Sequence, residues 1–136
     1  MKKGRKLLTA VVCCILMLGL STMALATVST NFFVKNVGEK KVTGSGTLTT
    51  VYATAKIKAE IIPGKPQQMG EACSSYVSVV ACDPNNTIIK SSVNTGNVYA
   101  STRIEYTSKA SCYKYTYRFG NTELGTYTVD ASQAKP

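Results

Sequence analysis

The sequence predicts an all-β fold, an immunoglobulin-like antiparallel β-sandwich of about seven strands, with a small closed β-barrel as the alternative. Three observations support this prediction. Apolar and polar side chains alternate over several segments. Short strand-like segments recur about every 10 to 15 residues, with turn residues between them. No segment after residue 26 has the periodicity of an amphipathic helix.

The clearest strand prediction covers residues 51–61. Every second side chain here is apolar, which is typical of a strand with one buried face and one face in water. The apolar positions are Val51, Ala53, Ala55, Ile57, Ala59 and Ile61. Because alanine is small, we expect the opposite layer to approach this strand closely. Pro63, Gly64 and Pro66 end the strand, and we expect a loop as far as Gly70.

The other strands are predicted from shorter alternating or valine-rich segments. In chain order they cover residues 31–37, 47–50, 75–82, 87–93, 98–106, 111–119 and 124–129. Turn residues separate them: Asp83, Pro84, Asn85 and Asn86 predict one hairpin turn, and residues 94–97 predict another turn. The Gly-Ser-Gly sequence at residues 44–46 predicts a flexible connection between the first two segments.

An aromatic stripe lies within the segment 111–119. Its members are Tyr113, Tyr115, Tyr117 and Phe119. The intervening positions include the charged residues Lys114 and Arg118, and burying two charges is costly. We therefore expect the stripe to face the core. An exposed stripe that contacts a glycan or a protein is the alternative.

Residues 1–26 are predicted to be a secretory signal peptide that forms a helix before its removal. Four basic residues precede an apolar run at 7–20, and the small residues Ala24 and Ala26 frame the predicted cleavage between Ala26 and Thr27. The short, lysine-rich start is typical of bacterial signals. Residues 27–136 are then a single secreted β-sandwich domain. An uncleaved N-terminal membrane anchor is the alternative.

The charge of the predicted mature chain is moderate. Four of the 16 basic residues lie in the signal, so 12 basic and seven acidic residues leave a net charge of +5. These basic residues are scattered and only two are arginines, which argues against a nucleic-acid partner. The partner is unknown from sequence; a cell-wall surface, a membrane surface and another protein are the candidates.

Three cysteines remain after signal removal: Cys73, Cys82 and Cys112. Export exposes them to oxidising conditions, so we expect one disulfide and one thiol. Cys73 and Cys112 each precede a predicted strand, and we predict that these two form the bond. Cys82 then stays a small buried thiol. The pairs Cys82–Cys112 and Cys73–Cys82, and no disulfide at all, are the alternatives.

Several kinds of chemistry are disfavoured. The chain has no histidine and no tryptophan, and it lacks the common nucleotide-binding and nucleophile motifs. We therefore predict no catalytic residues, no cofactor and no metal site. Glu60 and Glu105 are expected to be exposed strand charges that pair with Lys56, Lys58 or Arg103, and not a glycosidase pair. The segment 83–86 resembles a calcium loop only faintly, because the distal glutamate is missing.

These observations predict a secreted, non-catalytic β-protein, either a binding module or a module associated with the cell surface. A small cationic bacteriocin-like or toxin-like protein is the alternative, motivated by export and positive charge. Such proteins usually act through a basic amphipathic helix, which this sequence does not predict. An enzyme is the least favoured class.

Overall fold

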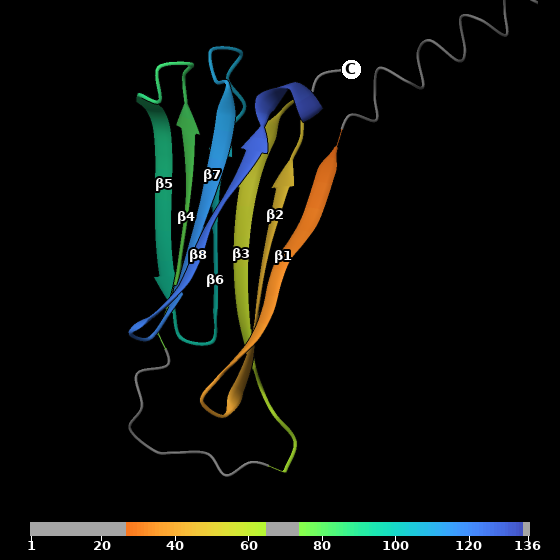
Figure 1. The fold of residues 1–136 in the computed structure, drawn as a ribbon, viewed down its shortest axis with the longest axis vertical. Coiled ribbons are helices and arrows are strands. Elements are labelled where there is room, and N and C mark those ends of the chain that lie inside the picture. Colours follow the sequence, from red (N-terminus) through yellow and green to blue (C-terminus); the bar gives the residue numbers. More distant parts are fainter. Residues whose placement is uncertain (1–26, 65–73, 135–136) are drawn as a thin grey trace, which may run out of the picture.

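The computed structural model describes residues 27–64 and 74–134, which form eight β-strands and a short 3-10 helix. The elements are β1 (Val28–Val37), β2 (Lys40–Leu48), β3 (Tyr52–Ile61), β4 (Ser75–Cys82), β5 (Ile88–Gly96), β6 (Tyr99–Glu105), β7 (Cys112–Phe119), β8 (Thr122–Asp130) and η1 (Ala131–Ala134). Two antiparallel four-stranded sheets, β1-β2-β3-β6 and β5-β4-β7-β8, pack together (Figure 1). The predicted all-β sandwich is confirmed, with eight strands where about seven were expected. The predicted signal-peptide helix lies outside the described residues.

The order of the strands is that of an immunoglobulin-like domain. In that fold, strands B and E pair in one sheet, and strands C, F and G lie together in the other. Here β3 and β6 take the places of B and E, while β4, β7 and β8 take those of C, F and G. β1 is an additional strand that pairs with β2 at the outer edge of its sheet (Figure 1).

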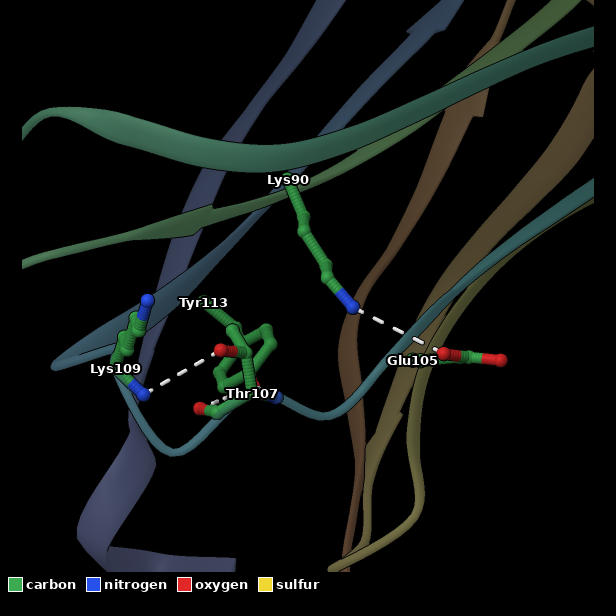
Figure 2. Close-up of polar contacts among 5 residues, drawn as sticks. All are labelled: Lys90, Glu105, Thr107, Lys109 and Tyr113. Atoms are coloured by element: carbon green, nitrogen blue, oxygen red, sulfur yellow. Dashed lines mark hydrogen bonds and ion pairs between the residues drawn. The ribbon is translucent and has the colours of Figure 1, made fainter.

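A tyrosine at the corner between β6 and β7 supports this correspondence. The Tyr113 hydroxyl accepts a hydrogen bond from the Thr107 backbone N–H at 2.9 Å and donates to the Thr107 carbonyl at 3.4 Å (Figure 2). A tyrosine near the start of strand F that bonds the preceding backbone is a hallmark of immunoglobulin-like folds. The same corner holds the ion pair between Lys90 on β5 and Glu105 on β6, at 3.9 Å (Figure 2).

The aromatic stripe of β7 faces the core, as predicted. Tyr113, Tyr115, Tyr117 and Phe119 are all buried. Tyr115 and Tyr117 span the sandwich, and their hydroxyls donate to the β2 carbonyls of Thr47 at 3.2 Å and Ser45 at 2.6 Å. Burial raises the pKa of both phenols, so these groups stay protonated and remain donors.

Strand β2 shows where the sequence prediction was wrong. Residues 44–46 were expected to be a flexible connection, but they lie in the middle of β2, paired on both sides. The glycines are needed for space, since an added Cβ at Gly46 would approach the Phe32 ring to 2.6 Å and the Tyr115 ring to 2.9 Å. Large side chains on β1 and β7 therefore fill the volume that β2 leaves empty.

Strand β3 confirms most of its prediction, but Val51 and Ile61, the predicted apolar positions at the ends of the segment, are exposed. Its alternating residues Ala53, Ala55, Ile57 and Ala59 are buried. Their small volume lets β3 pack against β4, one of the two central strands of the opposite sheet. The predicted turn at 94–97 is shorter than expected, because β5 continues to Gly96.

Candidate functional site

One face of the β5-β4-β7-β8 sheet points away from the core and carries polar and charged groups. On β7, alternate residues are buried against the core, and the register partners of the others lie on the same outer side of β4. On β4, Tyr76 and Val80 are partly exposed on this side, whereas Ser78 and Cys82 are buried. The outer-side residues of the two strands stand opposite one another in four pairs, namely Tyr76 and Arg118, Ser78 and Thr116, Val80 and Lys114, and Cys82 and Cys112. We call this surface the β4–β7 outer face.

A shallow pocket of about 240 Å³ lies at the Tyr76–Arg118 end of this face. Its lining residues are Tyr76, Thr116, Tyr117, Arg118, Glu123, Gly125 and Thr126. The pairing of β7 with β8 shifts register here, so that Tyr117 faces Gly125 while Arg118 faces Glu123. Gly125 has a φ of +107°, a backbone conformation that glycine adopts readily, and it allows this bulge.

The charged groups of the pocket are held in different ways. The Arg118 guanidinium lies 4.6 Å from the centre of the Tyr76 ring, a cation–π contact that orients it. Glu123 faces Arg118 across the strands, but the ion pairs found in residues 27–64 and 74–134 are Lys58–Glu60 and Lys90–Glu105. The Glu123 side chain is exposed, so its carboxylate oxygens can accept hydrogen bonds from a ligand.

Hydroxyl groups lie beside these charges. The Thr116 and Thr126 side-chain oxygens are 3.0 Å apart and share a hydrogen bond. A guanidinium only donates hydrogen bonds, a carboxylate only accepts them, and a hydroxyl does both. The pocket of Arg118, Glu123 and these threonines is therefore complementary to a ligand that bears several hydroxyl groups.

The opposite outer face, on the β1-β2-β3-β6 sheet, is more basic. Lys41, Lys56, Lys58 and Arg103 lie on it, together with Glu60 and Glu105. Arg103 stacks on Tyr52 at 4.0 Å, in the same way as Arg118 stacks on Tyr76. This second stack lies on the other side of the molecule and supplies an internal comparison for the pocket.

The two glutamates considered as a glycosidase pair are far apart. Glu105 stands opposite Tyr52 at one end of β3, and Glu60 lies eight residues further along that strand, ~26 Å away. Lys58 Nζ pairs with Glu60 at 2.8 Å; this hydrogen bond raises the pKa of Lys58 and lowers that of Glu60. Glu105 pairs with Lys90, which is not one of the three partners expected.

The segment 83–86 is a turn, as predicted. The Asp83 side chain accepts hydrogen bonds from the backbone N–H groups of Asn85 and Thr87, each at 2.9 Å. Asn86 has a positive φ of 63°, which asparagine tolerates. Across the parts of the chain that the structure describes, no group of three or more metal-ligating acidic or cysteine side chains is found.

The structure brings together two of the three cysteines. Cys82 ends β4 and Cys112 begins β7, and the register places them directly opposite each other. Both are thiols in the structure. Cys73 lies outside the described residues, so the predicted Cys73–Cys112 bond stays a prediction.

Sequence reasoning did not single out the residues of the pocket. Tyr76, Arg118 and Glu123 lie on three different strands, and the sequence shows nothing that separates them from other residues outside the core. The only local signal is Gly125 inside a strand-like segment, which is typical of a bulge.

Comparisons of the chain with protein-family models, with curated proteins and with solved structures find no match.

Proposed function

We propose that the chain is a secreted, non-catalytic binding module that holds one saccharide unit of a cell-wall glycan in the Tyr76–Arg118–Glu123 pocket. The observation that carries this proposal is the juxtaposition of a donor-only guanidinium and an acceptor-only carboxylate next to two threonine hydroxyls. A sugar ring presents neighbouring hydroxyls that both donate and accept, so it can engage all of these groups together.

The size and openness of the site support the same ligand class. Pockets for drug-sized ligands usually exceed about 300 Å³. A pocket of about 240 Å³ on an outer sheet face suits one ring of a chain whose neighbouring rings stay in solvent. The predicted export of the protein would bring it to the cell envelope, where such polymers are found.

The position of the aromatic stripe also bears on the proposal. The alternative in which Tyr113, Tyr115 and Tyr117 form an exposed contact surface does not apply, because all three are buried. Tyr76, on the neighbouring strand, lines the pocket together with the buried Tyr117, and it is the partly exposed one of the two. Its ring supports Arg118, so it contributes mainly by positioning the guanidinium.

Variants of the pocket should weaken binding to the cell-wall glycan. We expect Arg118→Ala to lower affinity about tenfold or more, because it removes hydrogen bonds from a charged donor. Glu123→Gln keeps the shape but replaces the charged acceptor with an amide, and we expect a comparable loss. Affinity is measured by co-sedimentation with purified bacterial peptidoglycan and by calorimetric titration with soluble peptidoglycan disaccharide.

Arg103→Ala is the matched control, because it removes the Arg103–Tyr52 stack from the opposite face. We expect it to bind as the unaltered chain does. Equal losses of glycan affinity in Arg103→Ala and Arg118→Ala would contradict the proposed site. No binding of the unaltered chain to purified peptidoglycan or to the disaccharide would contradict the proposed function.

A vesicle assay tests the cationic toxin-like alternative. Dye leakage from anionic vesicles, caused by the unaltered chain, would support that alternative.

A further inference from the structure

The Cys82–Cys112 pair stands at the end of the β4–β7 outer face remote from the pocket. The two residues are register partners on adjacent antiparallel strands, so both side chains project from the same face. Directly opposed residues in such a pair have Cα atoms about 4.5–5.5 Å apart. Disulfides form when this separation is about 4.4–6.8 Å. The backbone is therefore already placed for a bond between them.

We propose that Cys82 and Cys112 form the disulfide of the exported protein, by exchange with an external disulfide that reacts first at Cys112. This cross-link would join the two central strands of the β5-β4-β7-β8 sheet. The proposal concerns a different end of the sheet from the pocket, so it does not depend on the proposed function.

The register also argues against Cys73 as the partner of Cys112. The carbonyl of Ser74, the residue that follows Cys73 in the chain, accepts a hydrogen bond from the Gly120 N–H at 2.8 Å. Gly120 directly follows β7 and lies eight residues from Cys112, a distance of ~26 Å along a strand. One residue of chain spans only about 3.8 Å. The chain therefore enters the sheet at the end opposite Cys112, and the proposed pair replaces Cys73–Cys112.

Exposure sets the order of the exchange. Cys112 is partly exposed, whereas Cys82 is only 2% exposed, so an external disulfide meets Cys112 first. The Cys112 thiolate attacks one sulfur of a small disulfide RS–SR, forming a mixed disulfide and releasing one RS⁻, which takes up a proton. The Cys82 thiolate then attacks the Cys112 sulfur, closes the Cys82–Cys112 bond and releases the second thiol. Two protein thiols are thereby oxidised, and one external disulfide is reduced to two thiols.

The electrostatic surroundings agree with this order. Burial raises the pKa of the Cys82 thiol, and the adjacent Cys112 raises it further, while Lys114 acts in the opposite direction. A buried thiol that ionises reluctantly is a poor first nucleophile but a suitable second one once a mixed disulfide stands beside it.

Peptide mapping of the oxidised chain tests the pairing. The purified, reduced chain is treated with oxidised glutathione, remaining thiols are blocked with N-ethylmaleimide, and the digest is analysed without reduction. Trypsin alone leaves Cys73 and Cys82 on one peptide, because no lysine or arginine lies between them. Chymotryptic cleavage after Tyr76 separates them, and cleavage after Lys109 and Lys114 releases Cys112.

We expect the bond in the peptide pair that contains Cys82 and Cys112, both in the unaltered chain and in Cys73→Ala. In Cys82→Ala, a glutathione adduct should accumulate on Cys112; in Cys112→Ala, Cys82 should stay unmodified over the same time. A bond to Cys73, or no bond in Cys73→Ala, would overturn the pairing. Equally fast adduct formation on Cys82 in Cys112→Ala would overturn the order of exchange.

Discussion

Replacement of Tyr117 by alanine is expected to lower the free energy of unfolding by about 3–5 kcal/mol, the range for truncating a buried aromatic residue. Tyr117 is 1% exposed, and its ring contacts those of Phe32, Phe33 and Tyr127, with centroids 5.3–6.1 Å away. Truncation leaves a cavity among these rings and removes the donor for the Ser45 carbonyl. Urea denaturation monitored by far-ultraviolet circular dichroism measures the change.

Two comparisons separate packing from hydrogen bonding at this position. Tyr117→Phe keeps the ring and removes only the hydroxyl, so we expect a loss of about 1–2 kcal/mol. Tyr99→Ala removes a tyrosine that is 51% exposed and should change stability by about 0.5 kcal/mol or less. A Tyr117→Ala loss no greater than that of Tyr99→Ala would show that β7 does not face the core.

The second large effect is expected from Gly46→Ala, which adds a single methyl group. Elsewhere in a strand this change would stabilise, because glycine loses more conformational freedom on folding than alanine does. At Gly46 the new Cβ would collide with the Phe32 and Tyr115 rings. We therefore expect the free energy of unfolding to fall by about 1–3 kcal/mol, the usual cost of overpacking a filled core.

Ser45→Ala serves as the control for Gly46→Ala, because its side chain points to the other face of β2. It should change stability by no more than about 0.5 kcal/mol. Unfolding curves of both variants are compared with that of the unaltered chain under identical conditions. A stabilised Gly46→Ala variant would mean that the aromatic side chains of β1 and β7 do not fill the space over β2.

Strands that depend on local periodicity were predictable from the sequence. The predicted strand at 75–82 matches β4 at both ends, and the alternation at 51–61 gives β3 with its alanine face buried. Strand β2 was not predictable in its middle, because Gly-Ser-Gly has the local composition of a loop. Its residues pair with β1 on one side and β3 on the other, and the Phe32 and Tyr115 rings occupy the space above Gly46; these contacts join segments that are separate in the sequence.

The candidate site and the cysteine pair depend on strand register, and one sequence does not specify register between distant segments. Tyr76 meets Arg118 only because β4 pairs with β7 in one alignment, and the same alignment sets Cys82 against Cys112. Glu123 joins them through the shift beside Gly125. The prediction of a Cys73–Cys112 bond used strand-end positions alone, whereas the proposed Cys82–Cys112 bond uses the register of β4 and β7.

The most direct test of the central claim is a titration of the ¹⁵N-labelled chain with soluble peptidoglycan disaccharide, followed by amide chemical shifts. The proposed pocket predicts saturable shifts at Tyr76, Thr116, Arg118, Glu123 and Gly125, and unchanged amides at Tyr52 and Arg103 on the opposite face. Shifts confined to the β1-β2-β3-β6 face, or no shifts with a ligand that co-sedimentation shows to bind, would contradict the assignment of the site.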